Sequence, residues 1–239
     1  MTPNATKVTR IEPGSAEAAD PAGQPEWGLD LVVGPFVKIT IAVLVFAAVA
    51  IGVLHFLPPT SAISPFDRTI SEYGLTDSAW LFNLGVTALA VGTAVLFAGL
   101  VRSGRIRPFS WSTAFAALWT AGLLTLVYFP KSQYTAASGD GGDVHRLASF
   151  IAFVSLPIAI ALVARGLRSH RLAFWLGIGS LAWFVPMVAA AIIQAFTGGA
   201  DWWTVIPLGL LERGMALTEI AAILALALQS SRRRGLELT

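Results

Sequence analysis

Six long apolar stretches follow one another along this chain, and they constrain its fold more than any other feature. They cover residues 36–57, 79–101, 109–129, 145–163, 172–196 and 207–229. A helix needs about 20 apolar residues to cross the roughly 30 Å hydrocarbon core of a bilayer, and each stretch is close to that length. Membrane-spanning strands would instead alternate apolar and polar residues over about 10 positions, and no such alternation is present. The sequence therefore predicts an all-α, polytopic membrane bundle of six transmembrane helices.

The composition agrees with a membrane protein and excludes several kinds of site. Of the 239 residues, 55% are hydrophobic and only 13% are charged, whereas soluble domains carry about 25% charged residues. The chain has no Cys, which excludes disulfides, thiolate catalysis and thiolate metal sites. We expect a disordered cytoplasmic tail over residues 1–35, a transmembrane domain over 36–229 and a basic cytoplasmic C-terminus over 230–239.

The positions of Lys and Arg predict how the helices are oriented in the cell membrane. Twelve of the 16 basic residues lie before or at the start of the first stretch, after the second, after the fourth and after the last. Basic residues are enriched in cytoplasmic loops, so both termini are predicted to be cytoplasmic. The same argument explains the basic clusters without a nucleic-acid partner. The expected surroundings are bilayer lipid, and the sequence does not indicate an oligomeric state.

The first outer segment, residues 58–78, predicts a short interfacial helix. Ser64 is a typical N-cap residue, and Gly74 suits the left-handed position after a helix. Apolar side chains at helical spacing between them are Phe66, Ile70 and Tyr73. We expect an amphipathic helix that lies in the outer interface or folds back over the bundle.

Ionisable and amide side chains near the outer ends of the helices are the main candidates for function. Charged groups inside a bilayer are costly unless they are paired or hydrated. The candidate ligand-binding residues are Glu72, Asn83, His145, Arg146, Glu212 and Arg213. The arginines would bind an anionic group through charge-assisted hydrogen bonds, with acidic residues holding them in place. We therefore expect an outer-side pocket for a lipid headgroup or a small polar or anionic ligand, in a binding or transport-accessory role.

Glu219 lies deeper in the last apolar stretch than the other acidic residues. A carboxyl group near the middle of the membrane should face the bundle. We expect it either to be protonated or to accept hydrogen bonds from Thr87, Thr120 or Gln194.

Two other classes of function stay open. One is an intramembrane hydrolase-type enzyme in which His145 is the general base, a carboxylate such as Glu72 orients it and Ser71 is a candidate nucleophile. No G-x-S-x-G, H-E-x-x-H or Walker A motif supports such chemistry. The other is a structural subunit whose charges are all mutually paired. No cofactor or metal is predicted, and His55 with His145 is the one pair of histidines at similar depth that metal binding would use.

Glycine and proline positions predict how the helices pack. Close helix contacts are expected at Gly85, Gly92, Gly122, Gly177 and Gly179. Pro186 is expected to kink the fifth stretch.

Several short motifs of the chain resemble one known family. They are residues 67–74 (DRTISEYG), Asn83-Leu84-Gly85, Phe129-Pro130 with His145, and Leu211-Glu212-Arg213-Gly214. This pattern is similar to the uncharacterised prokaryotic membrane family called domain of unknown function 998 (DUF998), over residues 36–229. The resemblance implies a six-helix membrane protein with polar motifs on one side. It implies no activity, cofactor or catalytic residue.

Overall fold

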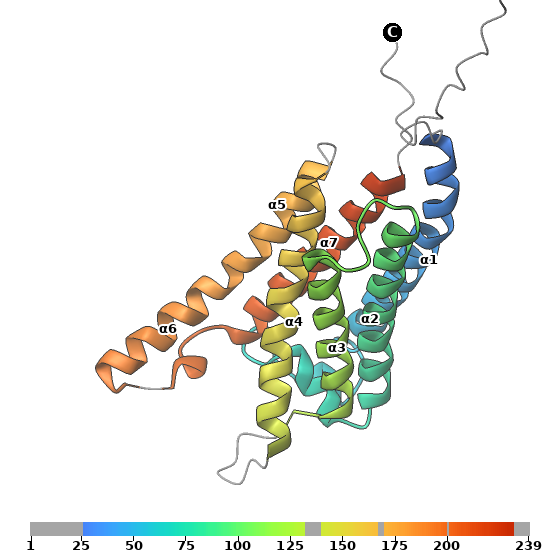
Figure 1. The fold of residues 1–239 in the computed structure, drawn as a ribbon. Coiled ribbons are helices and arrows are strands. Elements are labelled where there is room, and N and C mark those ends of the chain that lie inside the picture. The colour runs from blue at the N-terminus through green and yellow to red at the C-terminus, as the bar shows by residue number, and fades with distance from the viewer. Residues whose placement is uncertain (1–25, 132–139, 167–169, 200, 232–239) are drawn as a thin grey trace, which may run out of the picture.

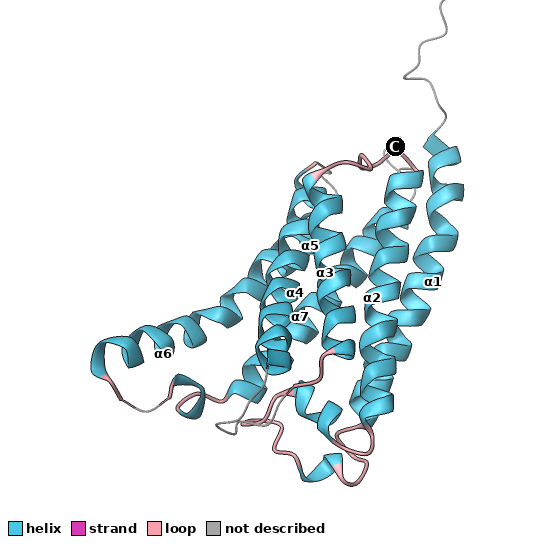
Figure 2. Ribbon diagram, turned by 60° about the horizontal axis from the view of Figure 1, so that its bottom comes forward, coloured by secondary structure: helices cyan, strands magenta, loops and turns pink. Residues whose placement is uncertain are grey.

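The computed structural model is helical throughout the residues that it describes, namely 26–131, 140–166, 170–199 and 201–231. The α-helices are α1 (Glu26–Val53), α2 (Ala79–Arg102), α3 (Trp111–Tyr128), α4 (Asp140–Arg165), α5 (Arg171–Ser180), α6 (Phe184–Thr197) and α7 (Leu208–Ser231). Short 3₁₀ helices are η1 (Thr60–Ala62), η2 (Ile70–Leu75), η4 (Leu181–Trp183) and η5 (Trp202–Thr204). Figure 2 shows helices and loops but no strand in these ranges, which confirms the all-α prediction.

Within the described ranges, five helical segments are long and apolar enough to cross a membrane. Four lie in α1 to α4, and the fifth runs continuously through α5, η4 and α6. The helix α7 has 24 residues but is not among the five, and it carries the charged residues Glu212, Arg213 and Glu219. The chain is therefore a multi-pass helical membrane protein. Five of its six predicted spans are both long enough and apolar enough to cross a membrane.

The ends of the described chain lie together. The start of α1 and the end of α7 are at the same end of the bundle, at the top of Figure 1. The helix α1 begins at Glu26, so the predicted tail boundary at residue 35 lies inside this helix. The rest of that tail and the predicted C-terminal segment from residue 232 onward are outside the described residues.

Small residues let neighbouring helices approach closely. The predicted close contacts are found at Gly85, Gly92, Gly122 and Gly177. A Cβ atom on Gly122 of α3 would lie 3.0 Å from the carbonyl oxygen of Ala148 on α4. The prediction is wrong for Gly179, which has no neighbouring atom within 4 Å of that position. Helix pairs α1–α2 and α3–α4 therefore pack with their backbones close together.

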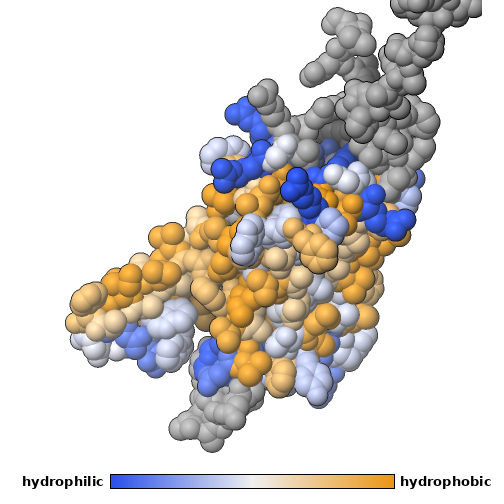
Figure 3. All heavy atoms as spheres, viewed as in Figure 1, coloured by the Kyte–Doolittle hydropathy of each residue, from blue (hydrophilic) through white to orange (hydrophobic). Residues whose placement is uncertain are grey.

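The fifth span bends and leaves the bundle. The helix α5 packs against α4 and α7, the 3₁₀ segment η4 follows, and α6 begins two residues before Pro186. Proline has no N–H to continue the helical hydrogen bonds, so the expected bend is found beside it. Figure 1 shows α6 diverging from the other helices, and Figure 3 shows apolar residues along the upper side of this arm. Only Ala190 is buried in α6.

The first outer segment folds back onto α2 and α7, but it does not form the predicted α-helix. Ser64 does act as a cap, since its Oγ accepts from the N–H of Asp67 at 3.4 Å. The carbonyl oxygen of Phe66, however, accepts from the N–H of Leu210 at 2.9 Å, and the N–H of Ile70 donates to the Glu212 carboxylate. These two groups would bond each other in an α-helix. Hydrogen bonds to α7 therefore replace the predicted α-helix over residues 64–74, and within that range only the η2 residues are helical.

Candidate functional site

Arg213 of α7 ties the outer segment to the bundle. Its Nη1 donates to the carbonyl oxygens of Pro65 at 2.9 Å and Arg68 at 2.7 Å. Its Nη2 donates to the Tyr73 hydroxyl at 2.9 Å, and its Nε donates to Nε2 of His55 at 3.0 Å. The guanidinium carbon also lies 5.7 Å from the centre of the fully buried Tyr73 ring. These contacts make Arg213 a structural clamp, and it lines neither of the cavities described below.

Glu72 of η2 pairs with basic side chains and lines neither of the two cavities described below. The residue is 7% exposed, and its carboxylate forms ion pairs with Arg68 at 2.6 Å and with Lys131 at 2.9 Å. The Lys131 ammonium also donates to the Thr69 hydroxyl at 2.7 Å. Burial opposes ionisation of Glu72, but the hydrogen bonds and charges of Lys131 and Arg68 outweigh it and keep the pKa below its usual value. Glu72 thus fixes Lys131 in position.

A cavity of about 430 Å³, here called the outer cavity, lies between α4, α6, α7 and the outer loops. Its polar lining consists of Thr69, Ser71, Lys131, His145, Arg146, Ser149 and Glu212. Its apolar lining consists of Phe150, Phe153, Phe184, Met187, Trp202, Trp203, Leu208 and Met215. Lys131 and Arg146 face this space, whereas their ion-pair partners Glu72 and Asp143 do not line it. The cavity therefore presents basic groups, hydroxyl groups and the Glu212 carboxyl group together with aromatic side chains.

His145 contributes an unused hydrogen-bond acceptor to the outer cavity. Its ring is 3% exposed, and Nδ1 lies 2.8 Å from the carbonyl oxygen of Phe129. A carbonyl only accepts, so Nδ1 carries the proton and Nε2 has the lone pair of the neutral ring. In the part of the chain that the structure describes, Nε2 is buried without a hydrogen-bond partner.

The geometry gives little support to a catalytic or a metal-binding role for these residues. His145 is oriented by a carbonyl rather than by a carboxylate, and the Ser71 hydroxyl lies 3.0 Å from Thr69 Oγ1. His55 uses both ring nitrogens, one with the Ile51 carbonyl oxygen and one with Arg213. Among residues 26–131, 140–166, 170–199 and 201–231, no three His, Asp or Glu side chains form a cluster that could hold a metal ion.

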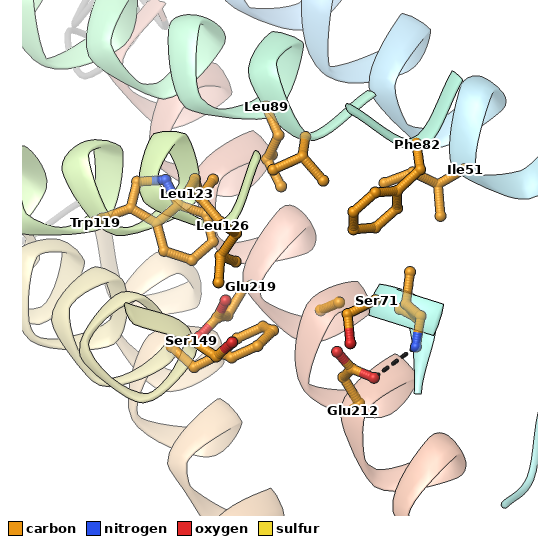
Figure 4. Close-up of a pocket in the computed structure, with 14 residues that line it drawn as sticks. Ile51, Ser71, Phe82, Leu89, Trp119, Leu123, Leu126, Ser149, Glu212 and Glu219 are labelled. Carbon is orange, nitrogen blue, oxygen red and sulfur yellow. Dashed lines mark hydrogen bonds between the residues drawn. The ribbon is translucent and has the colours of Figure 1, made fainter. Parts of the chain in front are cut away.

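A second, smaller space of about 60 Å³, here called the inner cavity, lies between α2, α3, α4 and α7 (Figure 4). Four residues line both cavities, namely Ser71, Ser149, Phe153 and Glu212. Glu212 accepts a hydrogen bond from the N–H of Ile70 at 2.6 Å. The two cavities are therefore neighbours that share a polar boundary.

Glu219 lines the inner cavity and is 1% exposed. Neither of its carboxyl oxygens has a hydrogen-bond partner within the described residues. The partners expected from the sequence bond elsewhere: Thr120 donates to the carbonyl of Ala116, and Gln194 donates to Asp201. The predicted hydrogen bonds to Glu219 are therefore wrong for these two residues.

A comparison with known families identifies the family of this chain. Residues 40–229 match the family model described as "Protein of unknown function (DUF998)". The chain belongs to the DUF998 family. No curated protein matches this DUF998 chain, and no solved structure does.

The motifs behind the family resemblance meet at the end of the bundle opposite the start of α1 in this DUF998 protein. The segment with Ile70 and Tyr73 bonds Glu212 and Arg213 of α7, across 142 and 140 residues of sequence. Phe129 bonds His145 in the same way across the loop between α3 and α4. Asn83 is an exception, since it lies about one turn into α2 and lines neither cavity.

Sequence reasoning missed several cavity residues of the DUF998 protein. Ser149 follows His145 by one helical turn on α4, and this i, i+4 spacing was the available signal. Trp202 and Trp203 face the outer cavity, although a Trp pair near a helix end is more typical of an interface anchor. No local signal pointed to Lys131, because its position depends on Glu72 in a distant loop.

Proposed function

We propose that this protein binds an amphiphilic lipid with an anionic headgroup in the outer cavity. The observation that carries the proposal is that basic and hydroxyl side chains line that cavity together with aromatic ones. The proposal takes α7 as the sixth membrane crossing and places both termini in the cytoplasm, in line with the distribution of basic residues. The outer cavity then lies in the half of the membrane away from the cytoplasm.

The headgroup would be recognised by charge and by hydrogen bonding. Lys131 and Arg146 supply positive charge to the cavity, and their carboxylate partners stand outside it. A phosphate or carboxylate would form charge-assisted hydrogen bonds with these two groups. His145 Nε2 would accept a hydrogen bond from a headgroup hydroxyl, because nothing in the described chain donates to it.

The apolar part of the lipid would enter from the membrane between α4 and α6. These two helices diverge beyond the contact between Phe150 and Phe184, whose ring centres are 5.8 Å apart. A notch separates the α6 arm from the rest of the molecule in Figure 3. Met187 lines the cavity side of α6, whereas Val188 is 53% exposed on its outer side. A volume of about 430 Å³ is within the usual range of roughly 300–1,000 Å³ for small-molecule sites.

The test uses two neighbouring substitutions on α6. Met187→Trp would fill the outer cavity, and Val188→Trp would add the same side chain to the lipid-facing surface. Native mass spectrometry of the full-length protein, released from membranes in mild detergent, would count retained lipids. We expect a headgroup-specific lipid on the wild type and on Val188→Trp, and its loss from Met187→Trp. Equal lipid retention by all three proteins would contradict the proposal.

The charge requirement has a separate test. The protein would be equilibrated with mixed micelles containing phosphatidylglycerol or phosphatidylcholine. We expect preferential retention of the anionic lipid by the wild type and loss of that preference in Arg146→Met. Arg102→Met is the matched control, because Arg102 is exposed at the other end of α2 from the outer segment. Unchanged preference in Arg146→Met would remove the assigned role of this residue.

A further inference from the structure

The inner cavity is lined mainly by apolar side chains. The helix α2 contributes Phe82, Val86 and Leu89, and α3 contributes Leu123 and Leu126. Figure 4 shows the labelled members of this set around the space. Most of the surface that a bound molecule would touch is therefore apolar.

The few polar side chains of this cavity offer little to a polar ligand. The Ser149 hydroxyl donates to the carbonyl oxygen of His145 at 2.8 Å, and the Ser71 hydroxyl lies 3.0 Å from that of Thr69. Both carboxyl oxygens of Glu219 are buried, without a hydrogen-bond partner among the described residues. A polar molecule would lose its hydrogen bonds to water here and find few in return, whereas an apolar one would lose none.

The volume of the inner cavity suits the end of a hydrocarbon chain. An engineered cavity of about 150 Å³ with apolar walls stays dry and binds benzene, which corresponds to ~25 Å³ per carbon atom. At that ratio, the volume of about 60 Å³ has room for roughly two carbon atoms. An empty space of this kind forfeits dispersion contacts that an alkyl group would restore.

The inner cavity continues the outer cavity toward the middle of the bundle. On α7, the outer cavity is lined by Leu208, Glu212 and Met215. The inner cavity is lined by Glu212, Ala216 and Glu219 of the same helix. These residues recur at intervals of three and four, so they form one stripe along α7. From Glu212 to Glu219 the helix rises about 10 Å at ~1.5 Å per residue, and the same face therefore runs from the headgroup site to the inner cavity.

We propose that the inner cavity receives the methyl end of one acyl chain of the lipid held in the outer cavity. This inference rests on the proposed lipid site and adds to it a subsite that selects acyl-chain length. The chain would pass Phe153, which lines both cavities, and a second acyl chain would remain in the membrane between α4 and α6. A chain too short to reach the inner cavity leaves it empty, and a chain that is too long finds no room.

The test measures which acyl chains the full-length protein retains. The protein in mild detergent would be offered a mixture of phosphatidylglycerols with saturated chains of increasing length, and native mass spectrometry would record the bound species. We expect the wild type to favour one chain length. Ala216→Leu places a larger side chain in the inner cavity, so the favoured chain should become shorter by about two carbon atoms. Ala221→Leu is the matched control and should leave the favoured length unchanged, because Ala221 is exposed on the same helix.

A variant of the opposite kind keeps the test decisive if Ala216→Leu does not fold. Leu123 of α3 lines the inner cavity and does not line the outer one, so Leu123→Ala enlarges the inner cavity alone. We expect this variant to favour longer chains than the wild type does. Leu118→Ala on the same helix is its control, since Leu118 is 46% exposed.

The outcomes separate this subsite from the lipid site itself. A wild type that retains phosphatidylglycerol no better than phosphatidylcholine of the same chain length would overturn both proposals. A wild type that selects the anionic headgroup but has the same chain-length profile as Ala216→Leu and Leu123→Ala overturns the subsite alone, and the inner cavity is then an ordinary packing void. Opposite shifts in these two variants, absent from their controls, support the subsite.

Discussion

Two ionisable residues on the same helix have opposite surroundings. Arg213 donates to Pro65, Arg68 and Tyr73 of the outer segment and lies over the Tyr73 ring, so its charge and its donors are used within the protein. Glu219, about two turns further along α7, is more deeply buried and has no partner among the described residues. The comparison separates a charged group that the fold uses fully from an acidic group that the described residues leave unpaired. The former clamps the outer segment to α7, and the latter lines the inner cavity.

The largest effect on this comparison should come from Arg213→Ala. The change leaves the Tyr73 hydroxyl and several carbonyl oxygens without their donor, so we expect a loss of about 3 kcal/mol of unfolding free energy. Denaturant unfolding in detergent would measure it. Arg102→Ala is the control, since Arg102 is exposed. A loss in Arg213→Ala no greater than that in the control would contradict the role of Arg213 as a clamp.

Gly209→Ala should have the next largest effect. A Cβ atom at this position would lie 2.8 Å from the carbonyl oxygen of Pro65, which is backbone and has little room to move. We expect a loss of about 2 kcal/mol, as for other overpacked sites. Gly179→Ala is a matched helical control with no atom within 4 Å of the new Cβ. It should be neutral or stabilising, because alanine favours helix more than glycine does.

Lys131→Met should produce a smaller and pH-dependent effect. In the wild type, the lowered pKa of Glu72 stabilises the folded state at pH values above the ordinary carboxyl pKa of 4.5. This stabilisation is lost as the pH falls through the folded-state pKa. Removing Lys131 brings the folded-state pKa closer to the ordinary value, so the variant should lose about 1 kcal/mol at neutral pH and little at acidic pH. Unfolding midpoints measured across this range provide the check. An equal loss at every pH would indicate that packing, rather than the ion pair, is responsible.

The smallest effect, and one of opposite sign, is expected for Glu219→Met. Replacing a buried acid that has no partner among the described residues by an apolar side chain of similar length should raise the unfolding free energy by about 1 kcal/mol. The same unfolding assay applies, with Glu219→Gln as the polar control. A clear destabilisation by methionine would mean that the Glu219 carboxyl group stabilises the fold.

The sequence predicted the architecture because membrane spans are local features. Each apolar stretch reports its own length and hydropathy, so the helical spans could be identified without knowing how they pack. This approach failed for the first outer segment, where the predicted α-helix is absent. The hydrogen-bond groups of Phe66 and Ile70 are taken by Leu210 and Glu212, which lie more than 140 residues away and could not be paired with them from spacing alone.

The candidate site was predicted in part for the same reason. His145, Arg146 and Glu212 do line the outer cavity, because residue type and membrane depth already marked them. Glu72 and Arg213 were chosen on the same grounds, but the structure gives their charges to Lys131 and to the outer segment. Which charge meets a ligand and which holds the fold depends on partners in distant loops, and a single sequence does not report those.

The most direct test of the lipid site compares two adjacent positions on α6. A photo-crosslinking amino acid would be placed at Met187, which faces the outer cavity, and separately at Val188, which faces away from it. Illumination in native membranes, followed by mass spectrometry, identifies the lipids attached at each position. We expect adducts at position 187 to be enriched in anionic headgroups, and adducts at position 188 to follow the bulk membrane composition. The same lipid composition at both positions would contradict a selective lipid site between α4 and α6.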